Sequence, residues 1–244
     1  AVLSVVRKTE MYCREPWAWV LTAFTYGSTL AVFLSIILSE GASIFIGLFA
    51  LPPIIFALAT AAIVAPIVEE GAKATGILSS RPRLTEVENG IIYGSAIGLG
   101  FSATENVIYF ISAYYSAGVE VLISTIILRF LTSTFLHLGA SGVAGYGIGI
   151  ANVRKLAGMK PVRWTPFLLA AICLHAFFNF LSYIPSLLGG PYNTEITVGI
   201  LFVEMAMVWL VFAALRRKIK TLDRTSGCSV GSQIPSTNGS ASVP

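Results

Sequence analysis

Six long stretches of the chain are dominated by apolar residues and show no alternating pattern. They are Trp17 to Leu38, Pro53 to Leu78, Ile91 to Tyr114, Val119 to Ile150, Pro166 to Leu188 and Ile196 to Leu215. As a helix, each is long enough to cross a hydrocarbon layer of about 30 Å. Lipid admits only elements that satisfy their own backbone hydrogen bonds, and apolar runs without alternation favour helices over a barrel. The sequence therefore predicts an all-α, polytopic helical membrane protein with about six transmembrane helices.

Composition and charge agree with a membrane protein and exclude other classes. Hydrophobic residues make up 55% of the chain and charged residues 11%, whereas charged residues are about a quarter of soluble domains. The net charge of +4 comes from short basic clusters beside the apolar stretches, where such residues set membrane orientation, so nucleic-acid binding is not expected. Cys13, Cys173 and Cys228 lie far apart, which indicates neither a disulfide framework nor a zinc–thiolate site.

Basic residues mark one side of the membrane. They precede the first stretch and follow the second, fourth and sixth: Arg7, Lys8, Arg14; Arg81, Arg83; Arg154, Lys155, Lys160, Arg163; Arg216, Arg217, Lys218, Lys220. The intervening loops carry only Glu40, Glu120 and Glu195. By the positive-inside rule, both termini are expected in the cytoplasm. Residues 1–16 then form a cytoplasmic segment and 17–220 the transmembrane domain, while residues 221–244, rich in Ser, Gly, Thr and Pro, are predicted to be a disordered cytoplasmic tail.

Two stretches are longer than one crossing requires. An unbroken helix from Ser43 to Leu78 would be roughly 50 Å long, so Pro52 and Pro53 are expected to interrupt it. The stretch from Val119 to Ile150 is expected to be strongly tilted or to begin as an interfacial segment. Glycines in the third and fourth stretches form faces of small residues that favour close helix packing: Gly90, Gly94, Gly98; Gly139, Gly142, Gly145, Gly149.

Ionisable and amide side chains accumulate inside the apolar stretches. They are Glu69, Glu70, Lys73; Glu105, Asn106; Arg129, His137; His175, Asn179; and Glu204. Each charged group costs about 2.5–3.5 kcal/mol at mid-membrane, so such an accumulation indicates function. Both histidines of the chain are in this set. Counting residues from the basic ends places Glu70, Glu105, His137 and His175 at similar depths, which predicts one polar site within the membrane.

These residue types suit hydrolysis assisted by a metal ion. Two imidazoles and a carboxylate form a common zinc ligand set with an open position for water, so Glu105, His137 and His175 are the predicted ligands. Glu69 or Glu70 is then the base, and Asn179 is a candidate to orient a ligand or hold an oxyanion. Lys73 would keep Glu69 ionised. The alternative is that these groups only cross-link helices, a role assigned here to Arg129 and Glu204.

At these positions the sequence resembles the PrsW family of intramembrane proteases, which is related to CAAX-prenyl endopeptidases and bacteriocin-processing enzymes. Three motifs carry the resemblance, in the expected order and on separate stretches: E-E-x-x-K at 69–73, F-x-x-x-E-N at 101–106 and H-x-x-x-N at 175–179. His137 completes the set, and Asn106 has a supporting place in it. The resemblance implies peptide-bond hydrolysis on a membrane-anchored protein, such as an anti-sigma factor, in a plasma membrane, and gives Glu69, Glu70 and His175 catalytic roles.

The resemblance leaves the mechanism open. Glu105 stands where a CAAX endopeptidase would have histidine, and Lys73 replaces an arginine one position later, so prenylated substrates are not expected. The wider family can be interpreted as zinc enzymes or as glutamate proteases. Buried carboxylates and histidines also form proton or cation pathways in transporters, and a non-catalytic scaffold is a third alternative.

Overall fold

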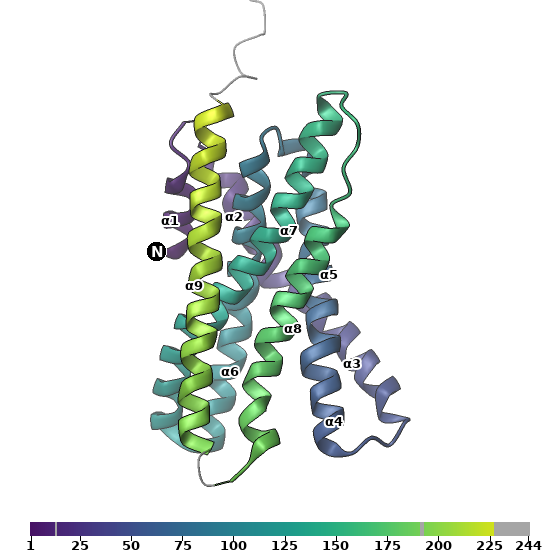
Figure 1. Cartoon of the computed structure of the whole chain (residues 1–244), viewed down its shortest axis with the longest axis vertical. Helices are drawn as coiled ribbons and strands as arrows, with labels where there is room; N and C mark the ends of the chain where they lie inside the picture. Colours follow the sequence, from purple (N-terminus) through teal and green to yellow (C-terminus); the bar gives the residue numbers. More distant parts are fainter. Residues whose placement is uncertain (13, 191–192, 227–244) are drawn as a thin grey trace, which may run out of the picture.

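The computed structural model describes residues 1–12, 14–190 and 193–226, and all the regular structure within them is helical. The helices form an elongated bundle (Figure 1). Their bounds are α1 Val2–Thr9, α2 Trp17–Tyr26, α3 Val32–Gly47, α4 Pro53–Leu58, α5 Ala65–Ser79, α6 Val87–Leu131, α7 Ser133–Leu156, α8 Thr165–Leu188 and α9 Asn193–Ser226. Short π-helical segments η1, Gly27–Ala31, and η2, Ala59–Val64, join α2 to α3 and α4 to α5, and a 3-10 turn η3 spans Arg81–Arg83.

Within the described residues, five helical ranges are long and apolar enough to cross a membrane: Trp17–Gly47, Pro53–Ser79, Val87–Leu156, Thr165–Leu188 and Asn193–Thr225. The third contains 70 residues and would be about 105 Å long if straight. It reverses at Gly118, whose φ of 81° and ψ of −167° are not helical and suit glycine because it lacks a Cβ. This range therefore crosses twice, and the prediction of about six transmembrane helices in an all-α fold is confirmed.

The interruptions predicted from length are found, one of them in a different form. α3 ends at Gly47 and α4 begins at Pro53, so no helix continues across the two prolines. The long fourth stretch is broken at Thr132, with φ −118° and ψ −76°, into the second arm of α6 and α7. A break between two helices thus accommodates the excess length that was expected to produce tilt or an interfacial segment.

Glycines bring the first arm of α6 into backbone contact with α7. A Cβ added at Gly90 would lie 2.3 Å from the carbonyl oxygen of Gly145, and one at Gly94 would lie 2.2 Å from that of Ser141. Side chains at these positions would hold the helices apart, so the predicted small-residue faces allow the close packing of α6 against α7. The pairing fixes the register of α7 against α6.

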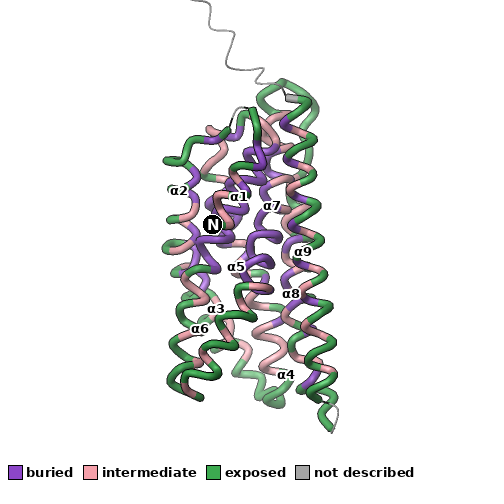
Figure 2. The backbone as a smooth tube through the Cα atoms, turned by 90° about the vertical axis from the view of Figure 1, so that its left-hand side faces the viewer, coloured by how far each residue is buried: buried purple, intermediate pink, exposed green. Residues whose placement is uncertain are grey.

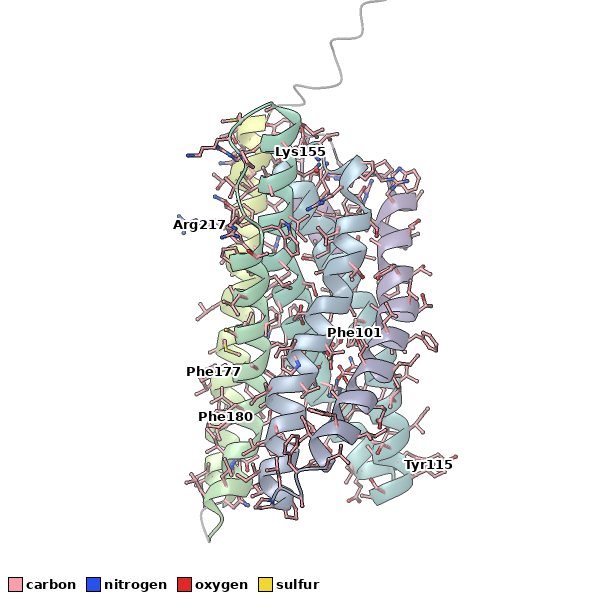
Figure 3. The ribbon with its side chains drawn as sticks, turned by 90° about the vertical axis from the view of Figure 1, so that its right-hand side faces the viewer. Phe101, Tyr115, Lys155, Phe177, Phe180 and Arg217 are labelled. Carbon is pink, nitrogen blue, oxygen red and sulfur yellow. The ribbon has the colours of Figure 1, made fainter. Side chains whose placement is uncertain are left out.

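Burial follows the expectation for a bundle in lipid. Buried positions lie between the helices, whereas much of the outer surface is exposed (Figure 2). That surface is apolar: Leu210 is 70% exposed and Phe33 is 60% exposed. Lys155 and Arg217 lie toward the end of the bundle where α9 ends, and Tyr115 lies at the opposite end (Figure 3). Apolar surface of this extent is stable when lipid covers it, which agrees with an integral membrane protein.

The two end segments of the described chain pack together. The backbone N–H groups of Met11 and Tyr12 donate hydrogen bonds to Asp223 at 2.8 and 3.2 Å, and Arg216 donates to Thr9 at 3.3 Å. α9 is helical through Ser226, so residues 221–226 of the predicted tail are helical. The rest of that predicted tail, residues 227–244, lies outside the described residues.

Candidate active site

The E-E-x-x-K motif places its charged groups on α5, inside the bundle. Lys73 donates a hydrogen bond to Glu70 at 2.6 Å and forms a longer ion pair with Glu69 at 3.7 Å. Its side chain is 1% exposed, and its Nζ lies 4.2 Å from the centre of the Phe101 ring. Because glutamates three and four residues before a lysine lie on the same side of a helix, the Lys73 ammonium group forms ion pairs with both carboxylates.

His175 on α8 lies between the two glutamates. Its Nδ1 is 2.9 Å from Glu70 Oε1, and its Nε2 is 3.9 Å from Glu69 Oε2. A carboxylate only accepts hydrogen bonds, so Nδ1 carries the hydrogen and Nε2 presents its lone pair toward Glu69 in the neutral ring. A carboxylate bonded to one ring nitrogen is the common way to fix the tautomer of an imidazole that binds through the other.

His137 on α7 completes the cluster and is held on both ring nitrogens. Its Nε2 is 2.8 Å from Glu105 Oε2, and its Nδ1 is 2.9 Å from Lys73 Nζ and 4.0 Å from Glu69 Oε2. Lysine only donates and the carboxylate only accepts. The neutral ring therefore carries its hydrogen on Nε2 and presents the Nδ1 lone pair toward Lys73 and Glu69.

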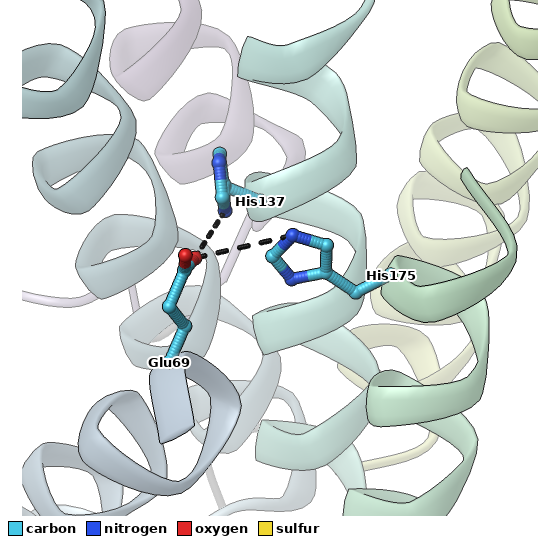
Figure 4. Close-up of side chains that lie close together, drawn as sticks. All are labelled: Glu69, His137 and His175. Atoms are coloured by element: carbon cyan, nitrogen blue, oxygen red, sulfur yellow. Dashed lines mark ion pairs between the residues drawn. The ribbon is translucent and has the colours of Figure 1, made fainter. Parts of the chain in front are cut away.

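Glu69, His137 and His175 form a group that could hold a metal ion. One ligand atom from each residue lies within 4.8 Å of the others (Figure 4). Glu69 Oε2 is buried and has no hydrogen-bond partner among the described residues, which is the state expected of an oxygen that binds a ligand. Glu105, predicted as a ligand, contacts His137 but is not part of this group, and its role as a ligand stays a prediction.

A cavity of about 280 Å³ opens beside these side chains. Glu69, Glu105, His137, His175 and Asn179 line it, together with Ala61, Ala65, Tyr109, Arg129, Ser133, Leu136, Phe178, Ser182 and Tyr183. Asn179 donates one amide hydrogen to the carbonyl oxygen of Ala61 at 2.8 Å, which leaves the other available. The predicted catalytic residues are therefore brought together around one space, apart from Glu70.

Glu70 is closed off from this cavity. Its side chain is 0% exposed and receives hydrogen bonds from Lys73, His175 and Ser141, the last at 3.4 Å. Glu69 is 13% exposed and lines the cavity. The two adjacent glutamates, which the sequence could not separate, thus occupy different environments.

Arg129 is the residue of this site that sequence reasoning treated as packing. Its Nη2 donates to Glu105 Oε2 at 2.6 Å and to Ser133 at 3.0 Å, and its Nε donates to Asn106 Oδ1 at 2.6 Å. A lone arginine in an apolar stretch was the available signal, but its partner lies 24 residues earlier. Glu204 lies apart from the cluster and accepts a hydrogen bond from Ser182 at 2.7 Å.

The fold and the site together define a polytopic membrane protein with a carboxylate–histidine centre inside its helix bundle. The family described as PrsW family intramembrane metalloprotease matches residues 15–215, and the chain belongs to this family. Protease PrsW from Clostridioides difficile (strain 630) is 31% identical over 186 residues, which are 72% of this chain and 72% of that protein. No solved structure matches the chain. The family resemblance predicted from the motifs is confirmed, and the family's proteases act on membrane proteins.

Proposed function

We propose that the chain is an intramembrane endopeptidase that hydrolyses a peptide bond of a membrane-anchored protein, with Glu69 as the group that activates water. The observation that carries the proposal is the position of Glu69. It lines the cavity and faces both imidazoles, at 3.9 and 4.0 Å, with a buried oxygen that has no hydrogen-bond partner in the part of the chain that the structure describes.

The reaction needs one proton to move twice. A water molecule in the cavity gives a proton to the Glu69 carboxylate as its oxygen bonds to the scissile carbonyl carbon. The carbonyl oxygen gains negative charge, and we assign its stabilisation to the amide group of Asn179, which lines the cavity. Glu69 then returns the proton to the amide nitrogen as the carbon–nitrogen bond breaks. The products are a carboxylic acid and an amine, and Glu69 is again ionised.

Glu70 acts on the reaction indirectly, through its hydrogen bond to the Nδ1 of His175. Its side chain is 0% exposed, Lys73, His175 and Ser141 donate to it, and it does not line the cavity. Its bond to Nδ1 keeps the Nε2 lone pair of His175 directed at Glu69. Glu70 is accordingly proposed as the residue that orients His175.

The same side chains fit a zinc ion. Glu69, His137 and His175 offer one oxygen and two nitrogens, a donor set typical of catalytic zinc. With zinc bound, Glu69 would be a ligand and not the base, and the ion itself would lower the pKa of a water molecule to about 7. Lys73 donates to the Nδ1 of His137 and must release that lone pair before it can bind an ion. This contact is the observation behind a second candidate, a glutamate protease in which Glu69 acts without metal.

The substrate and the location follow from the family. We propose a single-pass, anti-sigma-factor-like protein as the substrate and the plasma membrane as the site of action. The basic residues beside four of the predicted stretches support a topology with both termini in the cytoplasm.

The test compares Glu69→Gln with Glu70→Gln and a matched control, Glu40→Gln, at an exposed glutamate. Reporters built from anti-sigma-factor-like single-pass proteins carry a tag at each end and are co-expressed with each variant. We expect Glu69→Gln to reduce cleavage by about 10²- to 10⁴-fold, the usual contribution of a general base, with normal insertion and unfolding temperature. Glu40→Gln should cleave like the wild type. Full activity in Glu69→Gln would exclude Glu69 as the base.

A further inference from the structure

Arg129 is fixed in one orientation in the wall of the cavity. Its guanidinium donates to Asn106, Glu105 and Ser133 at 2.6, 2.6 and 3.0 Å and lies 3.7 Å from the centre of the Tyr109 ring. These partners come from the first arm of α6 and from α7, whereas Arg129 belongs to the second arm. The arginine therefore ties three helical segments together beside the site.

The acceptors of Arg129 are themselves held in place. Asn106 donates through its amide nitrogen to Ser102 at 3.2 Å and to Thr134 at 3.1 Å, which directs its oxygen at Arg129. Glu105 and Asn106, the E-N pair of the second motif, thus bind the guanidinium of Arg129, which lies outside every motif.

Arg129 reaches His137 through a shared oxygen. Glu105 Oε2 accepts from Arg129 Nη2 at 2.6 Å and from His137 Nε2 at 2.8 Å. An oxygen held by a rigid, permanently charged guanidinium has a fixed position, so the hydrogen of His137 is held on Nε2. The ring then presents its Nδ1 lone pair to Lys73 and Glu69.

We propose that Arg129 is a positioning residue: through Glu105 it fixes the ring orientation of His137 and, together with Lys73, its tautomer. The inference rests on the proposed function for its catalytic consequence, but not for its structural one. Helix cross-linking alone would require only an ion pair between Arg129 and Glu105. It would not require that the oxygen in this pair also accept from the imidazole.

The chain contains only two histidines, so nitrogen NMR of ¹⁵N-histidine-labelled protein in detergent can observe each ring separately. His137→Gln assigns the signals, and the spectra are recorded before and after treatment with a chelator. In the wild type we expect His137 with its hydrogen on Nε2 and His175 with its hydrogen on Nδ1. Arg129→Leu should shift the Nε2 signal of His137, because the guanidinium no longer holds its partner oxygen in place, and should leave the His175 signals unchanged.

Two further variants separate positioning from cross-linking. Arg129→Lys keeps the charge and should leave the Nε2 signal of His137 close to that of the wild type. Glu204→Leu removes a buried polar contact between α8 and α9 away from the imidazoles, and both histidine signals should stay as in the wild type. Should Arg129→Leu not fold, Asn106→Leu takes its place, because it removes one acceptor of the guanidinium and leaves the charge.

Kinetics on the reporter give the second readout. Loss of an orienting partner costs about 10- to 100-fold, and we expect it in kcat for Arg129→Leu, with KM unchanged and partial recovery in Arg129→Lys. Wild-type histidine signals in Arg129→Leu, or in Asn106→Leu when that variant replaces it, would overturn the inference. A wild type that cleaves no reporter while the His137 signals still respond would refute the proposed function and leave the positioning role standing.

Discussion

Gly98 offers the sharpest test of how helix packing sets the site. It lies on α6 against the backbone of α7 at His137, and a Cβ added there would lie 2.2 Å from the His137 carbonyl oxygen and 2.7 Å from its carbonyl carbon. An ordinary van der Waals contact begins at 3.4 Å. Gly98→Ala must therefore move the two backbones apart by about 1 Å, because backbone atoms cannot rotate away as a flexible side chain can.

The displacement has two costs of known size. Overpacking of this kind destabilises a protein by about 1–3 kcal/mol. The shift also acts at the residue that carries one imidazole of the site, whose bond to Glu105 is 2.8 Å long. A displacement of about 1 Å at a reacting group can reduce the rate by about 100-fold. We expect Gly98→Ala to lose both stability and cleavage.

Gly71→Ala is the matched control. Gly71 lies inside the E-E-x-x-K motif, and a Cβ there would meet nothing within 4 Å. Alanine favours a helix over glycine by about 1 kcal/mol, so this variant should be at least as stable as the wild type and equally active. Unfolding in detergent and reporter cleavage measure both effects. Equal stability and activity in the two variants would refute the packing argument.

Two further predictions concern metal and pH. Elemental mass spectrometry should find about one zinc per chain in the purified protein, lost in His175→Ala and kept in Glu204→Gln; a wild type without metal would favour the glutamate mechanism. Burial, reinforced by the nearby carboxylates of Glu15, Asp223 and Glu86, raises the pKa of Glu10 from 4.5 to about 8. Between these pH values the folded chain keeps the Glu10 proton that the unfolded chain releases. The contribution of Glu10 to the free energy of unfolding is therefore fully present below pH 4.5 and is lost as the pH rises to about 8. The unfolding temperature of Glu10→Gln should fall less than that of the wild type between pH 5 and 8, and equal decreases would contradict this assignment.

The features that the sequence predicted correctly are those set by single-helix properties. Apolar length gave the crossings, Pro53 gave the break before α4, and the cost of burying charge in lipid drew attention to the glutamates and histidines. The break at Thr132 could not be predicted, because neither proline nor glycine marks it in the sequence.

The sequence also could not predict which distant residues pair with each other. Arg129 finds Glu105 only because α6 reverses at Gly118, and a residue count does not supply the register of that reversal. The end of α9 was missed for a related reason. The composition of residues 221–226 suggests disorder, but Asp223 accepts hydrogen bonds from the segment before α2. The bonded residues lie more than 200 positions apart in the sequence.

The two adjacent glutamates of the E-E-x-x-K motif have different environments because they lie on a helix. Consecutive residues on a helix point about 100° apart, so Glu69 and Glu70 cannot share one environment. Glu70 turns toward Ser141 and the Nδ1 of His175, and Glu69 turns toward the cavity. Lys73, at four and three residues from them, reaches both. The spacing of E-E-x-x-K then has a physical reason: one lysine pairs with both a buried carboxylate bonded to His175 and a carboxylate that lines the cavity.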